Sequence, residues 1–276
     1  MSIAVSGPIV LVGAGNMGGA MLAGWLKSGV RSSDVLVIDP GPSPAMAKLL
    51  ADSGVQHATS APAGGKAGAI FLAVKPQVME TVLPPLKGLV GPQTVIVSVA
   101  AGKTLGFIER HLGEAATVRA MPNTPAMIGR GVTGAFANAR VSDAQRALVH
   151  DLLKVSGPVE WVGSEADIDA VTAVSGSGPA YVFYFMEAVM QAASELGLSP
   201  EQARALTLET FQGAAALARQ SDESPALLRE RVTSKRGTTE RALEHMERDQ
   251  VRAHVAAAVK QAAERSRELG DELGAN

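Results

Sequence analysis

The 276-residue sequence contains no cysteine, which excludes thiolate nucleophiles, cysteine-ligated zinc, iron–sulfur clusters and disulfide bonds. Aromatic residues make up only 4% of the chain and the formal net charge is −2, whereas nucleic-acid-binding proteins usually carry a basic face with stacking rings. No apolar stretch approaches the roughly 18 residues that span a membrane. The N-terminal segment lacks the basic start of a secretory signal. We expect a soluble, cytoplasmic protein.

Metal-ligand patterns are also missing. The five histidines stand at positions 57, 111, 150, 245 and 254 and form no HxH or HxxxH pair. Zinc and related metals need such clustered ligands, so we expect no metal site.

A glycine-rich segment, GAGNMG at 13–18, lies between an apolar run and a helical pattern. In this context it predicts dinucleotide binding, because Gly13 makes a tight turn, Gly15 lets backbone amides approach a pyrophosphate and Gly18 lets the helix pack closely. The helix N-terminus adds unpaired N–H groups. Asp39 ends a second apolar run 21 residues after Gly18, where such proteins place an acid. A glycine-rich turn without a ligand is the less favoured alternative.

Apolar runs that alternate with helical patterns predict a parallel sheet covered on both faces. Strands are expected at 8–12, 35–38, 69–74, 94–99 and about 116–120, with edge strands at 131–137 and 157–162; helices are expected at 16–28, 43–53, 77–87, 104–111 and 142–154. After residue 164 only helices are expected, at 165–174, 179–196, 200–220, 224–232, 238–247 and 249–269. The predicted fold class is α/β, with a Rossmann-type doubly wound sheet over 1–164 and an all-α domain over 165–276.

The helix expected over 179–196 is apolar almost all round. Such a helix is buried on several faces, and the C-terminal half offers few residues to cover it. We therefore expect an intertwined homodimer formed through the C-terminal helices.

Three segments follow predicted strands, at the edge where open α/β sheets bind ligands. In AVKP (73–76), Lys75 either faces a nucleotide or opens a helix in solvent, and the spacing favours neither. The small residues at 98–102 suit a nicotinamide ring close to the backbone, although a simple turn fits equally well. In MPNTPA (121–126) two prolines stiffen a loop, where Asn123 either binds a carboxamide or caps its own backbone.

Two further turns lie in the C-terminal half. SGSGPAY (175–181) predicts a glycine–serine turn that either contacts a small polar substrate or acts as a hinge and helix cap. The turn over 234–240 opens the helix at 238–247, and free amides at a helix start bind carboxylates. On spacing alone a capping threonine is favoured there by about two to one.

Taken together, these motifs resemble those of pyrroline-5-carboxylate reductase, the enzyme of the last step of proline biosynthesis: GAGNMG (13–18), AVKP (73–76), SVAAG (98–102), MPNTPA (121–126), SGSGPAY (175–181) and TSKRGTTE (233–240). The resemblance runs in order over nearly the whole chain. It implies hydride transfer from NADPH or NADH to the imine carbon of 1-pyrroline-5-carboxylate. It also implies an interleaved homodimer that often assembles further, with active sites between the cofactor of one subunit and helices at the dimer interface.

The resemblance implies roles for individual residues. Cofactor contacts are implied for Val12, Gly13, Ala14, Gly15, Asn16 and Met17 at the pyrophosphate, for Ala73, Val74, Lys75 and Pro76 along the nucleotide, and for Ala100 and Asn123 near the nicotinamide. The amides of the turn from Ser234 through Gly237 and Thr238 to Thr239 are implied to bind the substrate carboxylate. Thr239 matches the threonine whose hydroxyl meets the ring nitrogen, and Asp222 lies near an acid position of the substrate region.

Two positions depart from the family pattern. Arg236 stands where the turn usually has glycine; it either costs about 1 kcal/mol of backbone strain or reaches the substrate carboxylate. Asp39 suits an adenosine ribose and repels a 2′-phosphate, which favours NADH, whereas many family members prefer NADPH. The sequence leaves the choice between NADH and NADPH open.

Two other functions compete with this interpretation. A β-hydroxyacid dehydrogenase needs a lysine on its long interdomain helix, but residues 175–200 contain no Lys, Arg or His. A non-catalytic dinucleotide sensor would bind the cofactor without turnover, and the intact MPNTP and SGSGPAY segments argue against it.

Overall fold

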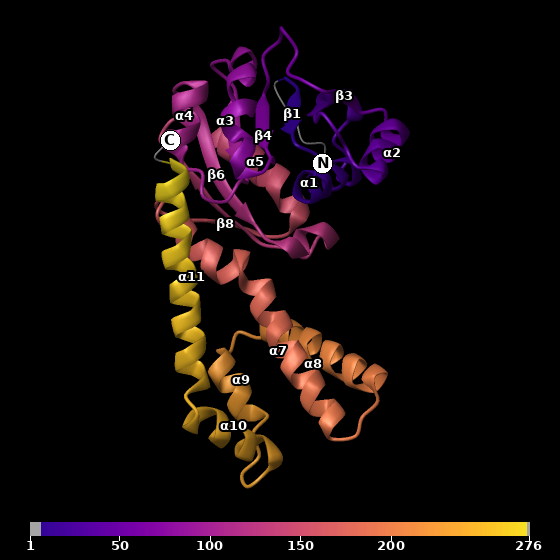
Figure 1. Ribbon diagram of the computed structural model, residues 1–276, viewed down its shortest axis with the longest axis vertical. Coiled ribbons are helices and arrows are strands. Elements are labelled where there is room, and N and C mark those ends of the chain that lie inside the picture. Colours follow the sequence, from indigo (N-terminus) through magenta and orange to yellow (C-terminus); the bar gives the residue numbers. More distant parts are fainter. Residues whose placement is uncertain (1–6, 275–276) are drawn as a thin grey trace. The chain divides into compact units, whose positions relative to one another are not determined.

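The computed structural model describes residues 7–274, and the chain divides into two compact units (Figure 1). Unit 1 comprises the chain up to Ser177 together with the segment from Ala262 onward, and unit 2 comprises Gly178–Gln261. The domain boundary expected between residues 164 and 165 stays a prediction. Within 7–274, no helix is both long enough and apolar enough to cross a membrane.

Unit 1 is built on an eight-stranded sheet with the order β3-β2-β1-β4-β5-β6-β7-β8. The strands are β1 (Ile9–Val12), β2 (Val35–Ile38), β3 (Gln56–Ala58), β4 (Ala69–Leu72), β5 (Val95–Ser98), β6 (Ala116–Pro122), β7 (Thr133–Ala137) and β8 (Val159–Trp161). The strands pair in parallel, except that β7 runs antiparallel to β6. Because β1 pairs with both β2 and β4, the winding direction reverses at β1, and its carboxyl end opens the crevice where such sheets bind ligands.

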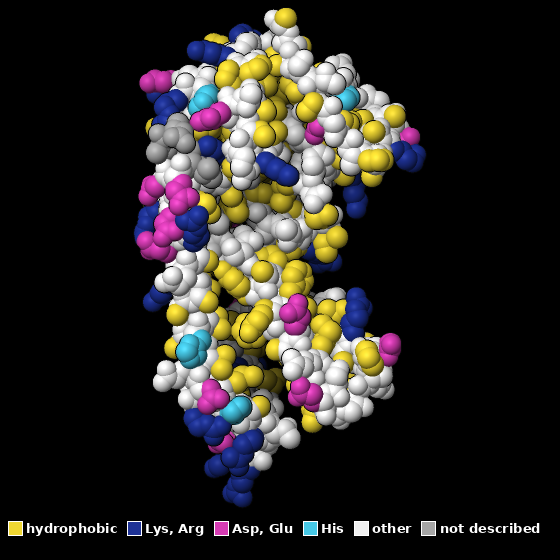
Figure 2. Space-filling view, in the orientation of Figure 1, with side chains coloured by type: hydrophobic (Ala, Val, Ile, Leu, Met, Phe, Trp, Pro, Cys, Tyr) yellow, Lys and Arg dark blue, Asp and Glu magenta, His cyan; other side chains and the backbone are white. Residues whose placement is uncertain are grey.

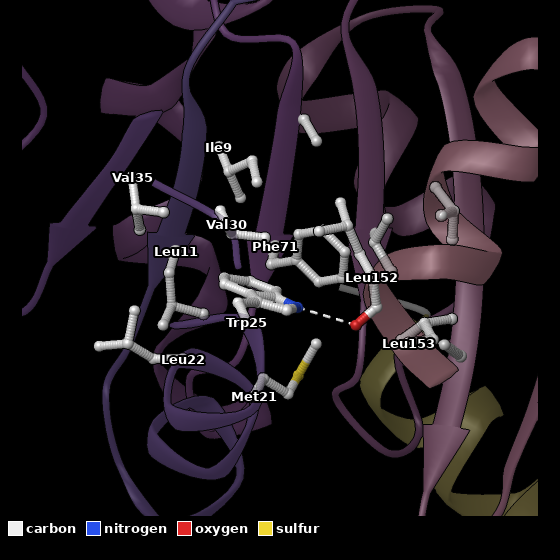
Figure 3. Close-up of a cluster of buried hydrophobic side chains, with 14 of the residues drawn as sticks. Ile9, Leu11, Met21, Leu22, Trp25, Val30, Val35, Phe71, Leu152 and Leu153 are labelled. Atoms are coloured by element: carbon white, nitrogen blue, oxygen red, sulfur yellow. Dashed lines mark hydrogen bonds between the residues drawn. The ribbon is translucent and has the colours of Figure 1, made fainter. Parts of the chain in front are cut away.

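Two apolar layers cover the two faces of this sheet, and alternate residues of β1 belong to one layer and the other. One layer contains Trp25 of α1 (Asn16–Lys27), whose side chain is fully buried. Its indole N–H donates to the Leu152 carbonyl at 2.8 Å, and its ring meets Phe71 edge-on with centroids 4.9 Å apart (Figure 3). Burial on both faces explains why the strands are continuous apolar runs in the sequence.

The other helices of unit 1 are α2 (Pro44–Ser53), α3 (Met79–Val82), α4 (Leu105–Leu112), α5 (Asp143–Leu153) and α6 (Asp167–Val171). Hydroxyl side chains set three of the starts: Ser43 caps α2, Thr104 caps α4, and Ser142 forms a capping box at α5. The single helix expected over 77–87 is interrupted. Only α3 is α-helical there, because Pro84 and Pro85 start a 3-10 segment in its place.

Unit 2 is helical, with α7 (Gly178–Glu195), α8 (Pro200–Gln220), α9 (Pro225–Arg231), α10 (Thr238–Arg248) and the first part of α11 (Val251–Gly274). Ser199 caps α8 as expected, through a capping box with Gln202. The glycine–serine turn expected over 175–181 is wrong, because Thr172–Gly176 form a π-helix just before α7. A π-helix keeps the chain helical while it shifts the hydrogen-bond register by one residue.

Helix α7 is apolar and exposed. No residue of α7 is buried, and the side chains of Phe183 and Tyr184 are 57% and 71% exposed. Figure 2 shows hydrophobic side chains gathered over the helices of unit 2. The burial predicted for 179–196 is therefore not supplied by the chain on its own, and an exposed apolar surface of this kind typically marks an interaction site.

Candidate dinucleotide and substrate sites

The glycine-rich loop that joins β1 to α1 is tight on one side and open on the other. Gly13 has φ +88°, and a Cβ there would lie 2.9 Å from the Ala73 backbone. A Cβ on Gly18 would lie 2.1 Å from the Gly13 carbonyl oxygen, so α1 packs against the loop at a distance that only glycine permits. A Cβ on Gly15 would meet no atom within 4 Å. The loop is therefore closed towards the sheet at Gly13 and Gly18 and accessible at Gly15.

The N-terminus of α1 offers unpaired donors next to Gly15. Gly15 is the N-cap residue and makes no side-chain cap, and the first helical hydrogen bond runs from the Gly19 N–H to the Gly15 carbonyl at 2.7 Å. The N–H groups of Asn16, Met17 and Gly18 precede that bond. Met17 packs its side chain partly against the core, so its contribution to a ligand is its amide. Free amides, a helix N-terminus and an absent Cβ fit a dinucleotide pyrophosphate.

A cavity of ≈ 500 Å³ lies beside this loop. Ala14, Gly15 and Asn16 line it on one side, and the segment from Asp39 into α2 lines it on the other. The Asp39 carboxylate joins the two sides, because Oδ2 accepts the Ala14 N–H at 2.7 Å and Oδ1 accepts the Gly41 N–H at 2.8 Å.

The other cofactor candidates lie after the strands next to β1. Ala73 follows β4, and its N–H donates to the Val12 carbonyl at 2.8 Å, which fixes the start of the AVKP segment against the end of β1. Val74 and Pro76 are half-buried and Lys75 is exposed. Ala100 follows β5 and is buried. These residues therefore share the carboxyl edge of the sheet with the glycine-rich loop.

The side chain of Asn123 does not cap its own backbone, which was one of the two alternatives predicted from the sequence. Its Oδ1 accepts the Val132 N–H at 2.9 Å, and its Nδ2 donates to the Ser175 carbonyl at 3.1 Å. It does not cap its own turn, the 3-10 segment Thr124–Ile128. The side chain links the end of β6 to the π-helix, and its position near a nicotinamide stays a prediction.

The turn before α10 carries the substrate candidates of unit 2. The Gly237 N–H donates to the Ser234 carbonyl at 2.9 Å, and Arg236 has φ +59°, the left-handed conformation in which glycine is usual. The Arg236 N–H donates to the Glu240 carboxylate at 2.5 Å. Arginine at this position therefore adopts the strained conformation, and Glu240 stabilises it from the first turn of α10.

The capping threonine favoured from spacing alone is wrong. Gly237 is the N-cap residue of α10 and no side chain caps the helix, so Thr238 and Thr239 are its first two residues. Their N–H groups have no intrahelical acceptor. A cavity of ≈ 640 Å³ is lined by Arg236, Gly237, Thr238 and three further residues of α10. Ser234, Thr239 and Asp222 do not line it; Thr239 is half-buried, and Asp222 is exposed between α8 and α9.

Sequence reasoning missed two contributors to these sites. Met127, the residue directly after the MPNTPA segment (121–126), lines the dinucleotide cavity, and only the fold brings it there. Glu240 holds the strained turn; its position four residues after Arg236, inside a helix start, was the available signal.

The fold and the glycine-rich cavity define a Rossmann-type, dinucleotide-binding oxidoreductase with a helical C-terminal domain. Comparison with family models agrees: residues 8–102 match the model described as NADP oxidoreductase, coenzyme F420-dependent, and residues 165–269 match pyrroline-5-carboxylate reductase dimerisation. With a relative that is 43% identical over 96% of this chain, the chain belongs to the pyrroline-5-carboxylate reductase family.

Relatives and solved structures are similar over almost the full length. The pyrroline-5-carboxylate reductase of Pseudomonas aeruginosa is 43% identical over 96% of this chain and 98% of its own, and that of Escherichia coli is 37% identical over 95% and 97%. The structure of the Coxiella burnetii reductase has a TM-score of 0.89 and 36% identity, covering 96% of this chain and 98% of that one. The Plasmodium falciparum reductase, solved with NADP bound, has a TM-score of 0.82 and 27% identity, covering 96% and 98%.

These comparisons confirm the resemblance, the fold class and the predicted activity. The chain is a pyrroline-5-carboxylate reductase of proline biosynthesis, an oxidoreductase that uses NADPH or NADH. Its C-terminal part is a dimerisation domain of that family.

Proposed function

We propose that the chain reduces 1-pyrroline-5-carboxylate to L-proline with the cofactor held by the loop Gly13–Gly18 and the substrate held by the turn Ser234–Thr239. The observation that carries this assignment is the pair of uncapped helix N-termini, at α1 and α10, each opened by a glycine. Each presents unpaired amides to an anion, one suited to a diphosphate and the other to a carboxylate.

On the cofactor side, the chain binds and orients. The α1 amides hold the pyrophosphate, and Asp39 and the AVKP segment hold the rest of the nucleotide. Ala100 and Asn123 border the nicotinamide. When bound, NADH or NADPH supplies the hydride that reduces the imine carbon.

On the substrate side, the N–H groups of Thr238, Thr239 and Glu240 bind the carboxylate. Glu240 leaves these amides free, because its own carboxylate is held by the Arg236 N–H. The Thr239 hydroxyl orients the imine nitrogen and relays its proton, with Ser234 and Asp222 completing the polar surroundings. A protonated imine is already electrophilic, so holding the reactants in contact and excluding water supply most of the catalysis.

We also propose that the chain works as a homodimer in the cytoplasm and that these dimers associate further, as the family resemblance implies. The exposed apolar surface of α7 supports the dimer, since Tyr184 and Phe183 would otherwise stand in water. Tyr184→Glu should produce monomers in sedimentation-velocity runs, with Glu195→Gln at the far end of α7 as the control. A wild-type chain that sediments as an active monomer would contradict the dimer.

The activity is tested by mixing the purified chain with 1-pyrroline-5-carboxylate and following the loss of reduced-cofactor absorbance with NADH and NADPH separately. L-Proline should accumulate in step with cofactor oxidation. Tight cofactor binding without turnover on this substrate would contradict the assignment and favour a sensor.

A further inference from the structure

The dinucleotide cavity contains a fixed negative charge. Both oxygens of Asp39 accept backbone N–H groups, from Ala14 at 2.7 Å and from Gly41 at 2.8 Å. One bond comes from the glycine-rich loop and the other from the turn that follows Asp39 itself, so the carboxylate cannot turn away from a bound nucleotide without breaking one of them. Each carboxylate oxygen still has a free lone pair and can accept a hydroxyl hydrogen.

The cavity offers this charge no positive counterpart. Among the twelve described residues that line it, Asp39 is the only charged one, and none is lysine or arginine. A 2′-phosphate carries up to two negative charges and is normally bound by such side chains.

The N-terminus of α2, which also lines the cavity, does not replace the missing lysine or arginine as a phosphate-binding group. Pro44 has no N–H to give, the Met46 N–H donates to Ser43 Oγ at 3.3 Å, and the Ala47 N–H donates to the Ser43 carbonyl at 2.8 Å. Ala45 keeps the remaining amide of the first turn. A single amide beside a carboxylate is a poor phosphate site, because phosphate cradles use several converging donors.

We propose that Asp39 makes this reductase prefer NADH over NADPH. Its carboxylate accepts a hydrogen bond from the 2′-hydroxyl of the adenosine ribose and repels the phosphate that replaces that hydroxyl in NADPH. The inference rests on the proposed cofactor site and goes beyond it, since either cofactor would satisfy the reaction.

The wild-type enzyme gives the first test. We expect kcat/KM to be at least about tenfold higher with NADH than with NADPH, the loss of one charge-assisted hydrogen bond being worth about that factor. Titration calorimetry with NAD⁺ and NADP⁺, without substrate, should show the same order of affinities. Added KCl should narrow the affinity ratio, because salt screens the repulsion.

Substitution then locates the effect. Asp39→Asn keeps an acceptor oxygen for the Ala14 N–H and removes the charge, so it should reduce the preference about tenfold, mainly through tighter NADP⁺ binding. Asp52→Asn is the matched control: it removes the same charge from α2 at an exposed site paired with Lys48, and the preference should not change.

Equal or better use of NADPH by the wild type would overturn the proposal, as would an unchanged preference in folded Asp39→Asn. If Asp39→Asn does not fold, the proposal is decided by the ratio of the wild-type affinities for NAD⁺ and NADP⁺ and by how that ratio changes with salt. An absence of turnover with both cofactors would contradict the proposed function instead. The affinities for NAD⁺ and NADP⁺ would still test whether Asp39 sets the cofactor preference.

Discussion

Alanine substitution of two glycines in the same loop should have two different effects: at Gly18 it should lower the stability of the fold, and at Gly15 it should weaken cofactor binding. A methyl group on Gly18 would lie 2.1 Å from the Gly13 carbonyl oxygen, roughly 1 Å short of van der Waals contact. The obstacle is backbone, so α1 must move away from the sheet. Overpacking of this kind costs up to about 3 kcal/mol, and the better helix propensity of alanine returns about 1. Gly18→Ala should therefore lower the free energy of unfolding by about 2 kcal/mol and the melting temperature by about 4 to 8 °C.

The same methyl group on Gly15 should leave stability almost unchanged. It meets no protein atom within 4 Å and Gly15 has φ −69°, which alanine adopts freely. The expected loss of stability is about 0.5 kcal/mol. Because Gly15 lines the cavity, the methyl group should occupy the approach of the pyrophosphate and weaken NADH binding about tenfold or more.

Thermal unfolding and cofactor titration on the two variants separate these effects. A melting temperature for Gly15→Ala as low as that of Gly18→Ala would refute the geometry of the loop. Wild-type NADH affinity in Gly15→Ala would refute the position of the pyrophosphate.

Three further substitutions test the substrate turn and the core. Thr239→Ala should lower kcat about 10- to 1000-fold while the NADH dissociation constant is kept, and Thr238→Ala should lose less; equal losses would remove the Thr239 hydroxyl from the mechanism. Trp25→Phe leaves the Leu152 carbonyl buried without its 2.8 Å donor, so urea unfolding should show a loss of about 1 to 3 kcal/mol, and a loss below 0.5, roughly the experimental error, would argue against that bond. Burial lowers the pKa of Lys103 in the folded chain. Between this lowered pKa and the ordinary lysine pKa of the unfolded chain, the unfolded chain binds more protons, so the free energy of unfolding should rise with pH. In Lys103→Met this rise should disappear, and a rise that persists would exclude Lys103 as its cause.

The strands of unit 1 could be predicted because both faces of a covered parallel sheet select apolar residues. In unit 1, every apolar run from which a strand was predicted contains a strand, such as Val35–Ile38 and Val95–Ser98. The missed strand, β3, reads Gln56-His57-Ala58; Gln56 and His57 are exposed and Ala58 is half-buried, so no apolar selection operates on either face there. Local pattern therefore predicts the covered strands and not the exposed one.

The candidate site was predictable where a motif carries its own geometry. Gly13 has the positive φ and Gly18 the close packing that the fingerprint requires, and Gly237 opens α10. The partners of Asn123 are 9 and 52 residues away, and no local signal announces such bonds. The π-helix at Thr172–Gly176 was not predicted because its signal is not local either. Two glycines close together indicate a turn unless tertiary packing extends the helix through them.

Both edges of the eight-stranded sheet are short. The outermost strands, β3 and β8, have three residues each, and Arg146 lies over the Trp161 ring of β8 at 4.3 Å from its centroid. Edges this short offer an incoming strand few free N–H and C=O groups, so sheet-to-sheet growth between chains, the usual route to strand-mediated aggregation, is disfavoured. Concentrated solutions of the reductase should therefore resist fibre formation, and chains should associate through their helical surfaces instead.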